Sequence, residues 1–299
     1  MTTQKAPRSG QPLTGRRLYD EVAVQTAAVV IKHYSTSFGL ATRLLGKSVR
    51  VHVQNIYALV RLADEIVDGV ASDAGLDGSA VLAELDALEA ETDRAVERGY
   101  STNLVVHAFA LTARRVGITR ELTEPFFASM RADCSETEHT PESFDAYVYG
   151  SAEVVGLMCL KTFLHGHRIS PEQERRLVDG AQHLGAAFQK VNFLRDLSAD
   201  FDVLGRNYFP GVHLDAFSDA DKNRLVADID TDLAISAAVL PELPDSSRRA
   251  VVLAQSLFAE LNERIRATPA ATLASTRVRV PNPVKAALAA RAAAGRMPR

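Results

Sequence analysis

Four polar side chains recur at helical spacing within an apolar stretch of the first third of the chain: Tyr57, Arg61, Asp64 and Asp68. At about 100° per residue they fall within roughly 60° of one another on a helix surface. Most other positions between Ile56 and Val67 are apolar, so we expect this helix to be largely buried. The polar stripe would then face a cavity rather than bulk water.

A second stripe of the same kind lies in the second half of the chain: Gln189, Asn192, Asp196 and Asp200, with Arg195 beside it. Its members share a helix face within roughly 80°. Carboxylates are unfavourable in a buried place unless they are paired or bound to a metal. If both stripes face one cavity, Arg61 and Arg195 are too few to neutralise the aspartates of the two stripes.

Divalent cations would resolve this excess of negative charge. Oxygen ligands from Asp and Asn suit Mg²⁺, which tends to keep waters and to share its coordination with substrate phosphates. Either stripe alone would be better explained as a solvated face that carries ordinary i,i+4 ion pairs. Two stripes, each set in a near-continuous apolar run, favour a functional site.

The elements that must position these stripes are helices. Apolar residues recur at intervals of three and four through most of the chain, and no alternating pattern bounded by Asn-Gly or Asp-Gly turns indicates hairpins. We therefore predict an all-α, single-domain helical bundle over residues 18–299, after a flexible tail over residues 1–17. The predicted helices are Leu18–Tyr34, Val49–Gly69, Ser79–Arg98, Thr102–Val116, Thr123–Cys134, Pro141–Leu164, Pro171–Ala199, Ser218–Leu240, Asp245–Ala267 and Pro283–Ala294.

Composition bounds the class of protein. The chain has 299 residues, 46% of them hydrophobic and 24% charged, which is ordinary for a globular protein. Its formal net charge of −3 argues against nucleic acid as a partner, and its two cysteines are too few for a disulfide framework. No signal-peptide core, bilayer-spanning run, Rossmann motif or P-loop is visible, so we expect a cytoplasmic protein, with or without peripheral contact with a membrane.

At these residues the sequence closely resembles the squalene/phytoene synthase family. The two stripes match its two aspartate-rich motifs, Asp64-Glu65-Ile66-Val67-Asp68 and Gln189-x-x-Asn192-x-x-Arg195-Asp196-x-x-x-Asp200. Further matches are Tyr34–Phe38, Tyr147–Gly156, Arg206–Pro210 and Arg277-Val278. The resemblance implies the all-α isoprenoid synthase fold, with a central cavity that takes two prenyl diphosphates.

The resemblance also implies roles for individual residues. Five would hold Mg²⁺, or Mn²⁺ in its place, directly or through water: Asp64, Asp68, Asn192, Asp196 and Asp200. Six would contact diphosphate oxygens: Ser35, Ser37, Arg61, Arg195, Arg206 and Arg277. Three tyrosines would line the reacting region, Tyr57, Tyr149 and Tyr208, and Gln189 belongs to the second motif.

The reaction that the resemblance implies is a head-to-head condensation in two half-reactions, through a cyclopropylcarbinyl diphosphate. Metal ions and arginines would neutralise the charge that develops on the leaving diphosphate. Apolar walls, including Phe38, Phe188 and Phe193, would keep water from the cation. Rearrangement and proton loss give a triene such as phytoene, whereas hydride from NADPH gives squalene, so NADPH is needed only for the second product.

Three alternatives remain open at this point. The first is the joining of two geranylgeranyl diphosphates to phytoene, and the second is the use of farnesyl diphosphate to make presqualene diphosphate, squalene or dehydrosqualene. The third is a non-catalytic assembly or binding protein, which the presence of all four motif aspartates disfavours. Thr36 and Glu153 depart from the family pattern, and so does the length of the segment 201–205. The basic segment Val284–Arg299 could lie on an anionic membrane surface, but a fraying helix with solvated charges is the favoured interpretation. Because the product would be extremely apolar, we nevertheless expect transient contact with a membrane for product release. The oligomeric state is open.

Overall fold

The computed structural model describes residues 14–35, 37–204, 207–212, 216–273 and 275–297, with the backbone alone at residues 37 and 198–204. Its helices are α1 (Arg16–Tyr34), α2 (Ser37–Thr42), α3 (Lys47–Val67), α4 (Val70–Asp73), α5 (Gly78–Arg98), α6 (Leu104–Val116), α7 (Arg120–Ser135), α8 (Pro141–Val148), η1 (Tyr149–Glu153), α9 (Val154–Leu164), α10 (Pro171–Leu204), α11 (Asp219–Val239), η3 (Leu240–Glu242), α12 (Asp245–Ala267), α13 (Ala270–Leu273) and α14 (Asn282–Ala293). Within the described part of the chain there is no β-strand, and one isolated bridge pairs Glu138 with Asn207. The predicted all-α, single-domain class is confirmed.

Several helices begin at residues whose side chains cap the first turn. Asn103 accepts hydrogen bonds from the amides of Val105 and Val106 at the start of α6. Thr140 and Ser143 form a reciprocal capping box at the start of α8, directly before Pro141 in the first turn. Ser170 caps α10, because its hydroxyl accepts a hydrogen bond from the amide of Gln173 at 3.1 Å.

The helix predicted over Pro141–Leu164 is interrupted. A single π-turn, η1, separates α8 from α9, and one added residue in a turn rotates everything that follows about the helix axis. Gly150 permits this packing, since a Cβ there would overlap the carbonyl oxygen of Pro125 and the hydroxyl of Ser129 on α7. Hydrophobic periodicity alone does not reveal such a turn.

Other boundaries also differ from those predicted. The helix α1 begins at Arg16, inside the predicted tail, and α10 continues past Ala199 to Leu204. The short helices α2, α4 and α13 were not predicted, because helices of four to six residues are too short to show a period.

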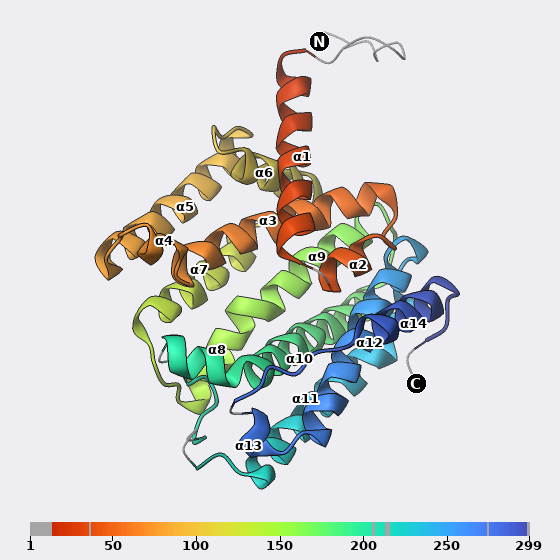
Figure 1. The fold of residues 1–299 in the computed structure, drawn as a ribbon. Coiled ribbons are helices and arrows are strands. Elements are labelled where there is room, and N and C mark those ends of the chain that lie inside the picture. Colours follow the sequence, from red (N-terminus) through yellow and green to blue (C-terminus); the bar gives the residue numbers. More distant parts are fainter. Residues whose placement is uncertain (1–13, 36, 205–206, 213–215, 274, 298–299) are drawn as a thin grey trace.

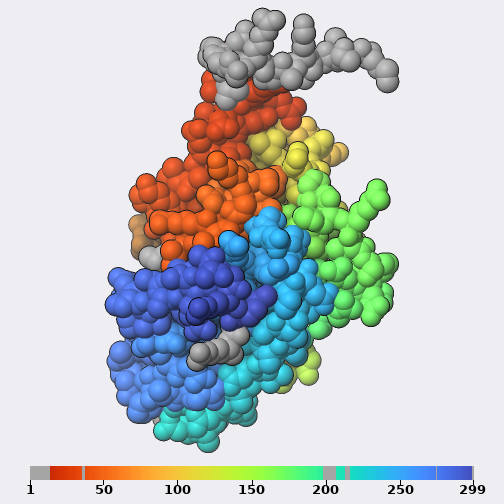
Figure 2. All heavy atoms as spheres, turned by 90° about the vertical axis from the view of Figure 1, so that its right-hand side faces the viewer, coloured from red at the N-terminus to blue at the C-terminus, as the bar shows by residue number. Residues whose placement is uncertain are grey.

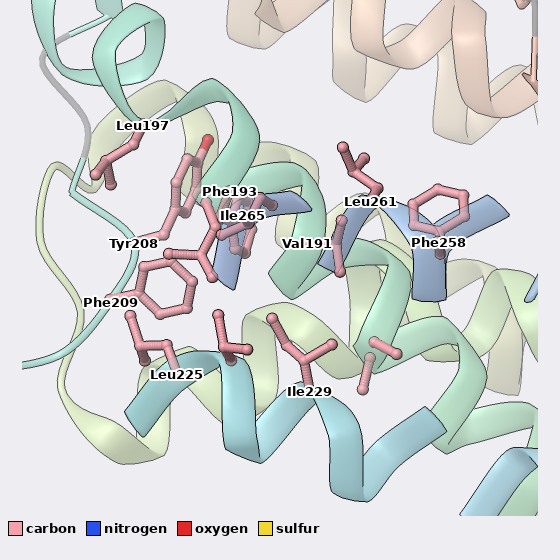
Figure 3. Packing of buried hydrophobic residues seen from close by; sticks show 14 of the residues in the cluster. Val191, Phe193, Leu197, Tyr208, Phe209, Leu225, Ile229, Phe258, Leu261 and Ile265 are labelled. Carbon is pink, nitrogen blue, oxygen red and sulfur yellow. The ribbon is translucent and has the colours of Figure 1, made fainter. Parts of the chain in front are cut away.

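Two groups of helices enclose the interior (Figure 1). The helix α3 packs against α1, α6 and α9, while α10 packs against α9, α11 and α12. The larger buried cluster joins α8, α10, α11 and α12, and Figure 3 shows Phe193, Tyr208 and Phe209 meeting Leu225 and Ile229 within it. A second cluster fills the space between α3, α5, α6, α7 and α9. Thus α3 and α10 are each held by a core of their own.

The C-terminal part returns across the bundle. After α13 the chain runs extended past α10 and ends in α14, which packs on α12 (Figures 1 and 2). This crossing places residues 275–281 against the polar end of α10, where Arg277 contacts Asp196. None of the described helices is long and apolar enough to cross a membrane.

Candidate active site

The polar stripe of α3 faces an internal cavity. Tyr57, Arg61, Asp64 and Asp68 all line it. The opposite face of α3 is buried through Leu59 and Ala63 in the second cluster. The amphipathic pattern therefore fixes the rotation of α3, and the acidic residues at its C-terminal end point inward as expected.

The stripe of α10 faces the same cavity from the other side. Gln189, Asn192, Arg195 and Asp196 line it, while Val191 and Leu194 pack into the larger cluster. The two rows thus line the same cavity, as a shared cation site requires. We call the part of the cavity beside these rows its polar end.

Asp64 shows the electrostatic strain of this arrangement. Burial raises the pKa of its carboxyl from 3.8 to about 7, and the neighbouring negative charges of Asp68 and Asp133 add to the rise. Arg61 acts in the opposite direction, with Nη1 4.0 Å from Asp64 Oδ2. The ionised Asp64 carboxylate therefore has too little neighbouring positive charge to offset its burial.

Two further contacts hold Arg61, which lines the cavity. Its Nη2 pairs with Glu65 one turn further along α3, and its guanidinium lies 4.7 Å from the centre of the Tyr34 ring. Its Nε is buried and has no hydrogen-bond partner. The guanidinium is thus oriented while one donor remains for a ligand.

Asp196 is held by two arginines, its neighbour Arg195 and Arg277, which lies 81 residues further along the chain. Arg195 Nε donates to Asp196 Oδ1 at 3.0 Å, and Arg277 Nε lies 2.8 Å from the same oxygen. Two cations and a carboxylate therefore stand together at the polar end of the cavity. This set can bind an anion such as a diphosphate, because the arginines can turn from Asp196 to phosphate oxygens.

Most of the remaining lining of the cavity is apolar. The volume of the cavity is about 920 Å³. The lining includes Phe38, Phe188 and Phe258, whose rings lie against one another. It also includes five residues of a third buried cluster: Phe163, Leu177, Leu240, Leu243 and Leu257. A molecule with a charged head and a long hydrocarbon tail matches this division.

The structure brings most of the predicted residues to this cavity. Besides both stripes, Ser35, Tyr208 and Arg277 line it. Arg206 and the side chains of Ser37 and Asp200 lie outside the described residues. The backbone of Asp200 continues α10 one turn beyond Asp196.

Tyr149 stands apart from the other predicted tyrosines. It is the first residue of the π-turn η1 and packs against the second buried cluster, and it is not among the residues that line the cavity. Tyr147, two residues earlier, lines the cavity. The role that the family resemblance implies for Tyr149 stays a prediction.

Several cavity residues were missed by the sequence reasoning: Tyr34, Asp133, Tyr147, Arg279 and Lys285. A signal was present for Asp133, which follows Phe126 and Met130 along the buried face of α7 at intervals of four and three residues. An acidic residue that continues an apolar face is a candidate for a buried site. Nothing comparable distinguishes Arg279 and Lys285, whose approach to the cavity depends on the extended crossing after α13.

The donor set at the polar end fits Mg²⁺ that is shared with a ligand. Asp64, Asp68, Asn192 and Asp196 offer oxygen atoms only. Among the described residues, no three acidic, histidine or cysteine side chains stand close enough to hold an ion by themselves. A cation here would complete its coordination with water and phosphate oxygens, as Mg²⁺ commonly does.

A family model described as squalene/phytoene synthase matches residues 31–283 of this sequence. The chain belongs to this family. It is therefore a prenyltransferase that joins prenyl diphosphates head to head.

Individual members show the extent of the similarity. The phytoene synthase of Pseudescherichia vulneris is 27% identical over 253 residues, which cover 78% of this chain and 79% of the relative. The 15-cis-phytoene synthase of Paracoccus sp. (strain N81106 / MBIC 01143) is 31% identical over 196 residues, covering 64% of this chain and 61% of the relative. A crystal structure of a dehydrosqualene synthase in complex with ligand has a TM-score of 0.76 at 22% identity and covers 93% of this chain and 98% of its own. The last similarity shows the shared fold.

Proposed function

We propose that this squalene/phytoene synthase family member is an Mg²⁺-dependent enzyme that joins two geranylgeranyl diphosphates to phytoene through a cyclopropylcarbinyl diphosphate. The observation that carries the proposal is that both aspartate rows line one cavity of about 920 Å³ whose remaining lining is mostly apolar. Such a cavity is at the upper end of the usual range for small-molecule sites, about 300–1,000 Å³, as two long tails require. The names of the sequence relatives in phytoene synthesis support the same choice.

The proposed Mg²⁺ ions would be held by Asp64, Asp68, Asn192 and Asp196, and they would supply electrostatic stabilisation of the leaving diphosphate. Asp200 is assigned to the same set from the motif. Arg61, Arg195 and Arg277 would bind diphosphate oxygens and neutralise the charge that develops as the carbon–oxygen bond breaks. Ser35, which lines the cavity, would add a hydroxyl contact, and the family motif assigns the same role to Ser37.

The apolar part of the cavity has the task of excluding water. An allylic or cyclopropylcarbinyl cation is captured by any water that reaches it, and the aromatic group of Phe38, Phe188 and Phe258 leaves no polar partner for water there. Loss of a proton, rather than hydride transfer, would end the reaction, so this proposal requires no NADPH.

The same site supports a second candidate, a farnesyl diphosphate-using enzyme that forms squalene or dehydrosqualene. The choice depends on the depth of the cavity, which Ala254 and Leu257 on α12 help to set. We expect purified protein with Mg²⁺ and labelled geranylgeranyl diphosphate to give a C40 hydrocarbon without NADPH, measured by product mass. A C30 product from farnesyl diphosphate alone would establish the second candidate instead.

Two variants test the role of the acidic rows. Asp64→Ala or Asp196→Ala should abolish turnover and leave the far-ultraviolet circular dichroism nearly unchanged, because these side chains serve the ligand rather than the core. Unchanged turnover in either aspartate variant would contradict the proposed metal site.

The length of the cavity is tested by a third variant. Ala254→Phe, which shortens the cavity, should lower the use of geranylgeranyl diphosphate relative to farnesyl diphosphate.

A further inference from the structure

Asp133 is a cavity carboxylate with no assigned role. Tyr147 Oη lies 2.8 Å from both of its oxygens, and Tyr208 Oη donates to Asp133 Oδ1 at 3.0 Å. All three residues line the cavity. They come from α7, from α8 and from the segment after α10, so one carboxylate joins three separate parts of the chain.

The two tyrosines belong to an aromatic wall, which we define as Tyr147, Phe193 and Tyr208. The rings of Phe193 and Tyr208 are stacked, with centres 4.0 Å apart and an angle of 12° between their planes (Figure 3). Tyr147 lies 5.2 Å from Tyr208 and 5.9 Å from Phe193, again between ring centres. His139 stacks behind Tyr208 at 5.8 Å and supports the wall from the side of the protein interior.

The aromatic wall stands beside the polar end of the cavity. Phe193 directly follows Asn192 on α10 and precedes Asp196 by three residues. Asp133 is near enough to Asp64 for its charge to raise the pKa of the Asp64 carboxyl. The rings therefore lie next to the place where the diphosphate head would sit, at the level of the first carbons of the tail.

Without Asp133 the position of the wall would be poorly determined. Tyr208 lies in an irregular segment, which is tied to the α7–α8 connection through the hydrogen bond from the Asn207 amide to the Thr137 carbonyl oxygen at 2.8 Å. Hydrogen bonds to a charged acceptor are stronger than neutral ones, and they fix the hydroxyl ends of both rings. Asp133 thus sets the tilt of each ring toward the cavity.

We propose that Asp133 is a positioning residue that orients Tyr147 and Tyr208 so that the aromatic wall stabilises the cationic carbon left when diphosphate departs. Aromatic faces attract cations, most strongly where water is excluded. The inference rests on the proposed function, since it presupposes a cationic intermediate. The experiments below distinguish this role from two others, that of a metal ligand and that of a packing residue without influence on the reaction.

The first experiment measures binding and does not need turnover. The probes are a geranylgeranyl dimethylammonium ion, which carries positive charge at the position of the cationic carbon, and the neutral geranylgeranyl methyl sulfide, each with Mg²⁺ and pyrophosphate. We expect Asp133→Ala to weaken binding of the ammonium probe by about 10-fold or more in calorimetry and that of the sulfide by less than about 3-fold. Equal weakening of both probes, or no preference of the wild type for the ammonium probe, would overturn the proposal.

The second experiment separates positioning from metal binding. In steady-state kinetics Asp133→Ala should lower kcat by about 100-fold, while KM and the Mg²⁺ concentration for half-maximal rate stay within about 3-fold. The double variant Tyr147→Phe/Tyr208→Phe should lose a similar factor, and adding Asp133→Ala to it should cost little more, because the carboxylate then has no hydroxyl to orient. Asp145→Ala, an exposed acid on α8, is the matched control.

The remaining outcomes are decisive as well. A large increase in the Mg²⁺ requirement of Asp133→Ala would make Asp133 a metal ligand and overturn the proposal. Asp133→Ala could instead lower the melting temperature and leave two quantities unchanged: kcat, and the ratio of coupled product to the alcohol formed when water captures the cation. That result would show that Asp133 is only a packing residue and would overturn the proposal. If wild-type protein with Mg²⁺ releases no diphosphate from any prenyl substrate but still prefers the ammonium probe through Asp133, the proposed function fails while the positioning role stands.

Discussion

Asp64 carries the clearest link between burial and charge in the site. Its pKa is about 7 in the folded protein and 3.8 in the unfolded reference, chiefly because of burial and then because of Asp68. A carboxyl with a raised pKa binds more protons when folded than when unfolded, so stability falls as pH rises from about 4 to about 7. We predict that Asp64→Asn does not show this loss of stability between about pH 4 and about pH 7, when both proteins have been treated with a chelator to remove metal ions.

The measurement is urea unfolding at pH 5 and at pH 7.5. Between pH 5 and pH 7.5 the free energy of unfolding of Asp64→Asn should rise by about 1–2 kcal/mol relative to that of the wild type. This is less than the full pKa shift would give, because 29% of the Asp64 side chain is exposed. Asp145→Asn, in an exposed position, serves as the control. A difference between Asp64→Asn and wild type that does not change with pH would show that Asp64 ionises normally.

Glu65 orients Arg61 rather than binding a ligand itself. It pairs with Arg61 Nη2, and only 17% of its side chain is exposed. Immobilising a long side chain on binding costs about 0.5–1.5 kcal/mol, and the ion pair removes part of this cost in advance. We predict that Glu65→Gln weakens inhibition by Mg²⁺-pyrophosphate by about 3- to 10-fold. The control is Glu84→Gln, which changes an exposed glutamate on α5. Unchanged or tighter inhibition would contradict this role.

At the level of single residues, the sequence predicted the side chains on regular helices and missed those that depend on irregular backbone. Asp64 and Asp196 follow from helical spacing within apolar runs. The role of Tyr149, at the start of the π-turn, came from the family resemblance rather than from a helical period, and it stays a prediction. Arg277 came from the family resemblance alone, since no local period relates it to Asp196, which it contacts across the bundle.

At the level of elements, α10 is the helix on which the site depends most. It packs on α11 through Gly180, where a Cβ would overlap Cγ2 of Val239. We predict that Gly180→Ala lowers the free energy of unfolding by about 1–3 kcal/mol, the usual range for overpacking. Because the overlap involves one methyl group, adding Val239→Ala should restore most of that loss.

The measurement is urea unfolding of the two single variants and the double variant. Val239→Ala alone supplies the cost of deleting the methyl groups, so the coupling between the two positions can be separated from it. Additive changes would mean that α10 and α11 move apart freely, and that Gly180 is not a required close contact. Hydrophobic periodicity predicted both helices, but it could not show this contact, because the distance between two helix axes depends on residues far apart in the sequence.

At the level of the whole molecule, the site is assembled from both halves of the chain. One acidic row belongs to α3 and the other to α10, Asp133 comes from α7, and Arg277 comes from the extended segment near the C-terminus. Each of α3 and α10 is anchored in its own core cluster. The fold class was predictable from composition and period, whereas the cavity exists only through the packing of these separate clusters.

A ligand that bridges the two rows should therefore stabilise the entire chain. Binding to the folded state alone adds about 2.7 kcal/mol at a ligand concentration of 100 times Kd, which corresponds to a rise in Tm of roughly 5 °C for a protein of this size. We predict this rise with Mg²⁺ and pyrophosphate together, and a much smaller one with either alone, since no three described carboxylate, histidine or cysteine side chains hold an ion unaided. Differential scanning fluorimetry measures the shift. Asp64→Ala and Asp196→Ala should each remove it, because either change leaves only one row to bind. A full shift that persists in either variant, or one produced by Mg²⁺ alone, would mean that the cation does not bridge α3 and α10.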